Sequence, residues 1–172
     1  MAPRAPSQQV KPVVSHRGGP AGAEVILAMA GMPPFQPVRI GFGSLSQYEV
    51  IGRGEADGEG KFAVDLRVPS WAELDRVHFF VVSFGNQMPR VLSDPFHVTD
   101  AEGTARIYGT ISAQGMSCLM LEGLENTLYT LEGHTGRWVP GQRVVVIGTV
   151  ADRPTCDSRG LPISVREIRQ SL

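Results

Sequence analysis

Five short apolar runs fill the last third of the chain: ARIYGTI (105–111), SCLMLEG (117–123), TLYTLEG (127–133), RVVVIGTV (143–150) and PISVREI (162–168). Each run is rich in β-branched or apolar residues and is bounded by glycine, proline or polar residues, as strands are. Five such strands within residues 103–172 predict a small closed β-barrel. Small barrels of this kind usually bind a partner or a ligand.

The strand pattern continues upstream over residues 24–100, in the runs EVILAMAG (24–31), VRIGFG (38–43), YEVIGRGEAD (48–57), KFAVDLRV (61–68), VHFFVVSFG (77–85) and PFHVT (95–99). KFAVDLRV alternates apolar with polar residues, which indicates a strand with one face on a core. The 20 glycines and 13 prolines of the chain fall mostly between such runs. We therefore predict an all-β protein of two domains, 24–100 and 103–172.

The run VHFFVVSF is apolar on both faces. Such a strand is either central and covered twice by its own domain, or covered on one side by the second domain or another chain. We favour cover by a neighbour, which makes Phe80, Val82 and Phe84 candidate partner contacts. In the preceding VPSWAELD, Ser70 and Glu73 have the spacing of a capping box, which predicts a single helical turn.

Residues 1–23 form an extended, proline-rich and basic arm that contains no acidic residue. Such a composition supports no core of its own, so the arm is either a solvated tail or is ordered by a partner surface. In the second case Arg4, Lys11 and Arg17 are candidate partner contacts.

Two resemblances sharpen the fold. The segments GMPPFQPVRIGFG (31–43), EADGEGKFAVDLRVP (55–69), VHFFVVSFG and LSDPFHVT (92–99) resemble the TIG-type immunoglobulin-like domains, which implies a β-sandwich over residues 24–100. Domains of this type share a fold far more than a function.

The C-terminal domain is similar to an uncharacterised bacterial OB-fold-like family, through YGTI, SCLML, TLYTLEG, PGQRVVVIGTV and the position of Cys156. The resemblance implies a five-stranded OB-like barrel and brings no known activity with it. The helix often found between the third and fourth strands is reduced here to HTGRWVPGQ (134–142), so that only Trp138 remains as a candidate contact there.

Cys118 and Cys156 are the two cysteines of the chain, near the second strand and after the fourth. If they lie on neighbouring strands, a disulfide would contribute about 3–4 kcal/mol on the loop-entropy model. The alternative is a pair of buried reduced thiols, and the compartment decides between the two.

Metal, cofactor and catalytic motifs are absent from the sequence. The histidines His16, His78, His97 and His134 have no ligand spacing, and no nucleophile elbow or phosphate-binding loop occurs. The GFGS stretch (41–44) is better explained as a strand bend, and GEADGEG (54–60) as a hairpin turn. We expect no enzyme activity, no metal and no cofactor.

Nucleic-acid binding is disfavoured by the charge pattern. An OB barrel binds single strands on its second and third strands with basic and aromatic side chains. Here residues 115–133 contain no Lys or Arg, one aromatic residue, Tyr129, and the acids Glu122, Glu125 and Glu132. The net charge of −1 adds no general attraction to a polyanion.

The start of the sequence has no apolar core of a signal peptide, and no run is long enough to span a bilayer. We expect the cytoplasm or the cytoplasmic face of a membrane, with the periplasm or cell envelope as the alternative.

These observations predict a structural or accessory subunit that bridges other proteins in a multi-subunit complex. Peripheral association with a membrane complex, such as a photosynthetic or respiratory one, fits a chain with a cationic arm. A cell-envelope ligand- or protein-binding module is the alternative, ahead of a nucleic-acid-binding protein or a small enzyme.

Overall fold

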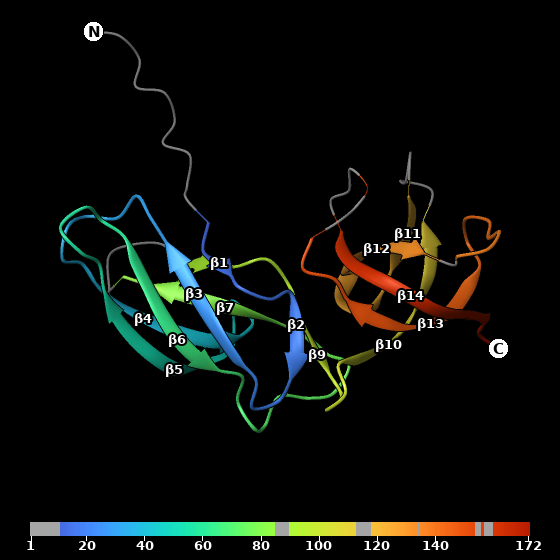
Figure 1. Cartoon of the computed structure of the whole chain (residues 1–172), viewed down its shortest axis with the longest axis horizontal. Coiled ribbons are helices and arrows are strands. Elements are labelled where there is room, and N and C mark those ends of the chain that lie inside the picture. The colour runs from blue at the N-terminus through green and yellow to red at the C-terminus, as the bar shows by residue number, and fades with distance from the viewer. Residues whose placement is uncertain (1–10, 85–89, 113–117, 134, 154–155, 157–159) are drawn as a thin grey trace, which may run out of the picture.

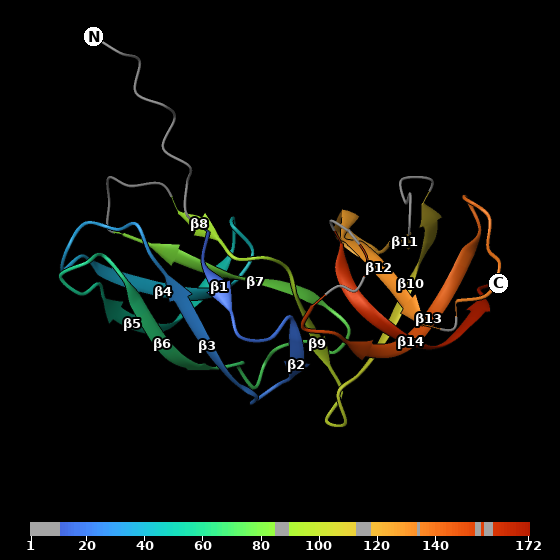
Figure 2. The same cartoon turned by 45° about the horizontal axis from the view of Figure 1, so that its top comes forward.

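The computed structural model describes residues 11–84, 90–112, 118–133, 135–153, 156 and 160–172. The described residues contain β-strands and one 3₁₀ turn, η1 (Leu124–Asn126), and no α-helix. Figures 1 and 2 show two β modules side by side, a sandwich-like pair of sheets and a closed barrel. The predicted all-β fold, with a sandwich followed by a five-stranded OB-like barrel, is confirmed.

The sandwich has two sheets. The larger sheet has the order β2-β9-β7-β4-β5, with β8 also paired to β7; its strands are β2 (Gly18–Pro20), β4 (Pro37–Gly43), β5 (Tyr48–Glu55), β7 (Val77–Ser83), β8 (Val91–Leu92) and β9 (Phe96–Thr99). The smaller sheet has the order β1-β3-β6; its strands are β1 (Val13–Val14), β3 (Glu24–Met29) and β6 (Phe62–Arg67).

Alternation of side chains builds the sandwich core. In β6, Phe62 and Leu66 are buried while Ala63, Asp65 and Arg67 are exposed, as the run KFAVDLRV predicts. The GFGS stretch lies at the end of β4, where the pairing with β5 shifts register between Ile40 and Gly41. The predicted strand irregularity is confirmed.

Strand β7 is central in its own sheet, because it pairs with β4 on one side and with β8 and β9 on the other. Phe80 and Val82 are fully buried in the sandwich core, together with Phe42 and Phe96. The prediction that a partner covers Phe80 and Val82 is therefore wrong, because the sandwich covers them itself. A neighbour does cover the start of the strand, where Val77 packs against the core of the barrel.

The barrel closes in the order β10-β11-β12-β14-β13. Its strands are β10 (Thr104–Ser112), β11 (Leu119–Glu122), β12 (Leu128–Gly133), β13 (Arg143–Val150) and β14 (Leu161–Gln170). All neighbours are antiparallel except β12 and β14, and β10 closes the ring on β13. Apolar side chains from every strand fill the interior, so the barrel has a solid core.

The sandwich begins before the boundary at residue 24 that the sequence predicts. Val13 and Val14 pair with β3, and Gly18–Pro20 pair in parallel with β9. The second half of the predicted arm thus supplies an edge strand to each sheet, while residues 1–10 lie outside the described residues.

One loop of the sandwich and the link between the modules meet the barrel. The segment 69–76 between β6 and β7 makes two successive turns, closed by Ala72 N–H to Pro69 O and by Arg76 N–H to Glu73 O, in place of the predicted helical turn. The segment between β9 and β10 is a tight turn in which the Asp100 carboxylate accepts from the N–H groups of Glu102 and Thr104. The turn between β9 and β10 is the covalent link between the modules, and the 69–76 loop of the sandwich contacts the barrel through Asp75.

Candidate protein-contact site at the domain junction

Three polar side chains from three elements meet where the modules touch. His97 of β9 lies between Asp75, before β7, and Tyr129 of β12: His97 Nε2 is 3.2 Å from Asp75 Oδ1, and His97 Nδ1 is 3.0 Å from the Tyr129 hydroxyl. Asp75 Oδ1 also accepts the backbone N–H of Arg106 in β10, at 2.9 Å. We call Asp75, His97 and Tyr129 the junction clasp, because they join both modules through one hydrogen-bond chain.

The chemistry of the clasp assigns its protons. A carboxylate only accepts, so His97 Nε2 donates to Asp75, and His97 Nδ1 bonds the Tyr129 hydroxyl, which can donate or accept. His97 is 1% exposed and Tyr129 is 2% exposed. Burial, followed by the charges of Asp75 and Glu125, raises the pKa of Tyr129 above its ordinary value. The Tyr129 hydroxyl therefore keeps its proton, and its role in the clasp is structural.

Further contacts close the junction around the clasp. Arg76 forms ion pairs with Glu73 at 3.1 Å and with Glu125 of the barrel at 3.6 Å. Gly18 of β2, the strand partner of His97, approaches the barrel so closely that a Cβ there would lie 2.6 Å from Val150 Cγ2. Glycine is required there because any side chain would push the modules apart.

Beside the clasp, three large apolar side chains line one cavity of about 200 Å³. Leu74 comes from the sandwich, and Tyr108 and Leu124 come from the barrel; they are 59%, 53% and 61% exposed. We call these three residues the junction patch. Large exposed apolar patches are common at interaction sites, whereas single scattered apolar side chains are ordinary on a surface.

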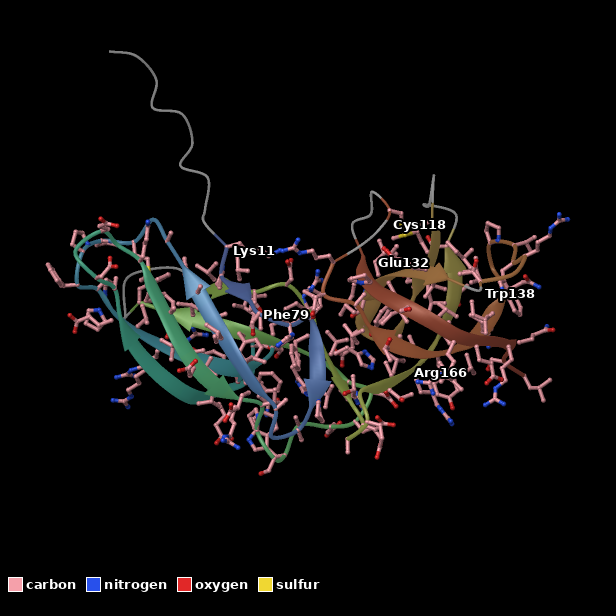
Figure 3. All side chains as sticks on the ribbon, in the orientation of Figure 1. Lys11, Phe79, Cys118, Glu132, Trp138 and Arg166 are labelled. Carbon is pink, nitrogen blue, oxygen red and sulfur yellow. A yellow bond between two sulfur atoms is a disulfide. The ribbon has the colours of Figure 1, made fainter. Side chains whose placement is uncertain are left out.

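A larger groove of about 570 Å³ adjoins the cavity of the patch, and Arg76, Val77 and Glu125 line both. Its aromatic wall is Phe42, Tyr48, Trp71 and Phe79, and its carboxylates are Glu49, Glu73 and Glu125. We call this the junction groove. Figure 3 shows Phe79 on the sandwich.

His78 lines the groove, and its buried Nε2 atom has no hydrogen-bond partner among the described residues. Its ring packs at 4.8 Å from Phe42 and 6.1 Å from Trp71, centroid to centroid. Burial lowers the pKa of His78 below its ordinary 6.5, so the ring is neutral at pH 7.

Cys118 and Cys156 are joined by a disulfide bond, with their Cα atoms 6.2 Å apart. Of the two alternatives that the sequence leaves open, the structure has the disulfide. Figure 3 shows Cys118 on the barrel, near Glu132. The bond links the start of β11 to the segment between β13 and β14, away from the junction clasp.

The other residues singled out from the sequence are dispersed. Lys11 forms an ion pair with Asp94, and Arg17 Nε donates to Pro95 O at 3.5 Å, while Arg4 lies outside the described residues. Phe84 packs on the sandwich core and Trp138 on the barrel core, where its indole N–H donates to Thr135 O. Lys11 and Arg17 thus contact consecutive residues of the sandwich, whereas Trp138 belongs to the barrel.

Nothing in the described parts of the chain gathers three or more potential metal ligands. Within those same parts, no helix reaches the length and hydropathy needed to cross a bilayer. OB barrels bind single strands on their second and third strands, and Tyr129 is the aromatic residue there. It is buried in the clasp and cannot stack on a base.

The residues of the junction carry little signal in the sequence. Asp75, His97 and Tyr129 are 22 and 32 positions apart and follow no motif. Leu74 and Leu124 look like ordinary loop residues, and Tyr108 occupies an outward position of a strand. The one available hint was the run of apolar residues in β7 that reaches beyond the sandwich core.

Comparisons of the chain with family models, with curated proteins and with solved structures found no match. The class that the fold and the junction define is thus a two-module β protein with a composite surface between its modules.

Proposed function

We propose that this protein is a non-enzymatic accessory subunit that binds other proteins in a larger assembly, and that the junction patch is its main contact. One observation carries the proposal: Leu74, Tyr108 and Leu124, from both modules, are each more than half exposed around one cavity. A monomer gains nothing by exposing them together, whereas a partner that covers them gains their burial.

Binding fits the junction better than catalysis does. The junction clasp has the residue types of a proton relay, but His97 and Tyr129 are buried, and the raised pKa of Tyr129 makes it a poor nucleophile. The clasp instead fixes the geometry of the patch, because it holds Asp75, next to Leu74, against β10 and β12 of the barrel.

Photo-crosslinking in the cells that make the protein tests the proposal. A benzophenone amino acid is placed at Tyr108 or at Leu124, and crosslinked products are identified by mass spectrometry. We expect the same partner protein from both positions, because the two side chains line one cavity.

Val139 is the matched control, since it is 61% exposed on the barrel. It follows Trp138, which lies at the end of the barrel far from the sandwich (Figure 3). The proposal predicts no such partner from position 139. Equal products from all three positions, or none from Tyr108 and Leu124, would refute it.

The disulfide favours a second candidate, a protein- or ligand-binding module of the cell envelope. Disulfides persist in oxidising compartments and are rare in the cytosol. Mass mapping of native material, alkylated before any reduction, decides between the two. An intact Cys118–Cys156 bond supports the envelope, whereas free thiols in that material exclude this candidate.

A further inference from the structure

We propose that the junction groove receives an arginine or lysine side chain from a basic segment of the partner protein. This inference rests on the proposed function and names the chemistry of the partner. Its support is the combination of charge and aromatic surface in one concave site.

The charge of the groove is negative. Among the residues that line it, Glu49, Glu73 and Glu125 supply three carboxylates and Arg76 one guanidinium, a formal charge of −2, which the guanidinium of Arg90 beside Tyr48 reduces to −1. His78 adds no positive charge at pH 7, because its burial favours the neutral ring. Arg76 pairs with Glu73 and Glu125, and the formal charge of the groove already includes its positive charge.

The aromatic wall supplies a second attraction for the same ligand. Trp71 is 44% exposed, and its ring is fixed edge-on against Phe42 at 5.8 Å. An indole face held in place and open to solvent is the best side-chain partner for a cation. The guanidinium of Arg90, which does not line the groove, lies 5.1 Å from the centre of the Tyr48 ring. Tyr48 thus already has a cation of the chain on its ring, and the exposed Trp71 ring is the one that a partner cation would contact.

The position of the groove fits a protein ligand. It adjoins the junction patch through Arg76, Val77 and Glu125, so one partner can cover the patch and place a side chain in the groove. At about 570 Å³, the groove has room for more than one side chain of an extended segment. An acidic peptide would meet repulsion at the same place.

Titration with capped peptides tests the inference on the full chain. In a Trp138→Phe variant, Trp71 is the single tryptophan, so its emission reports on the groove. We expect tetra-arginine and tetra-lysine to shift this emission at 50 mM salt, and tetra-glutamate to leave it unchanged. Raising the salt to 300 mM weakens binding of the cationic peptides, as screening requires.

Matched variants distinguish the groove from general charge attraction. Glu73→Gln and Glu49→Gln each remove one groove carboxylate, and we expect each to weaken tetra-arginine binding about 2- to 5-fold. Glu24→Gln removes an exposed carboxylate on β3, outside the groove, and leaves the affinity unchanged.

The inference is supported if tetra-arginine shifts the Trp71 emission, and if Glu73→Gln and Glu49→Gln weaken this binding while Glu24→Gln does not. It is overturned if tetra-arginine leaves the emission unchanged up to 10 mM, or if Glu24→Gln weakens binding as much as Glu73→Gln does. Either failure leaves the crosslinks from Tyr108 and Leu124 as a separate test, so the proposed function can survive without a basic ligand in the groove.

Discussion

The substitution Tyr129→Phe removes one oxygen atom from the junction clasp and leaves the ring in place. The ring packs in the barrel core, so the packing of the barrel is preserved. The substitution removes the hydrogen bond to His97 Nδ1, which keeps no other partner among the described residues.

The expected cost follows from burial. A buried polar atom that loses its hydrogen bond costs about 1–3 kcal/mol. His97 is 1% exposed, so water cannot replace the hydroxyl without opening the junction. For a domain whose total stability is about 5–15 kcal/mol, this is a substantial share. We also expect the two modules to lose part of their coupling, because the lost bond joins β9 to β12.

Each module contains one tryptophan, Trp71 in the sandwich and Trp138 in the barrel, which allows separate observation. In a Trp138→Phe background, the fluorescence of Trp71 reports urea unfolding of the sandwich. In a Trp71→Phe background, the fluorescence of Trp138 reports urea unfolding of the barrel. With Tyr129 present, we expect the two midpoints to coincide. With Tyr129→Phe, we expect a decrease of about 0.5–1.5 M, at an m-value of about 2 kcal/mol/M, and a separation of the two curves.

Tyr108→Phe is the control, because it makes the same change at a half-exposed tyrosine of the barrel. It should leave both midpoints unchanged. If Tyr129→Phe behaves like Tyr108→Phe in both backgrounds, the clasp does not couple the modules and this reasoning is wrong.

Three further perturbations test other parts of the structure. Below pH 6.5 the unfolded chain takes up a proton at His78 that the folded chain resists, so the free energy of unfolding falls as the pH drops from 6.5 toward the lowered pKa of the folded state. His78→Phe should reduce this loss, measured as the difference between urea midpoints at pH 7.5 and 5.5. A pH dependence equal to that of the parent would contradict this expectation. Gly18→Ala places a Cβ 2.6 Å from Val150 Cγ2 and should lower the free energy of unfolding by about 1–3 kcal/mol; denaturant unfolding with no loss would mean that β2 adjusts freely. The double substitution Cys118→Ser, Cys156→Ser removes the disulfide between residues 38 positions apart and should lower the free energy of unfolding by about 4 kcal/mol on the loop-entropy model. A calorimetric melting temperature equal to that of the oxidised parent would exclude a stabilising role for the bond.

The strands could be predicted from the sequence because their signals are local. Alternation in KFAVDLRV fixes which side chains of β6 point inward, and β-branched runs bounded by glycine mark the barrel strands. A local pattern cannot say what covers an apolar face, however. Phe80 and Val82 read the same whether their cover is another chain or, as in the structure, the opposite sheet.

The junction could not be predicted, for a related reason. The polar contact between His97 and Tyr129 requires two modules to dock, and neither residue lies in a periodic or motif-like context. Likewise, the pairing of Gly18–Pro20 with β9 joins segments about 80 positions apart, and proline and glycine are more typical of loops. The local composition of residues 18–20 therefore indicated a loop, whereas a long-range pairing makes them a strand.

The order of elements along the chain has a consequence for synthesis. Domains generally fold as units, the N-terminal one first, while the ribosome is still adding residues. When β9 emerges, the sandwich is complete, but His97 has no hydroxyl to meet until Tyr129 follows 32 residues later. During that interval Val77 also lacks its barrel cover. The nascent sandwich thus presents its docking face to solvent or to a chaperone until β13 and β14 have followed and the barrel can close around Tyr129.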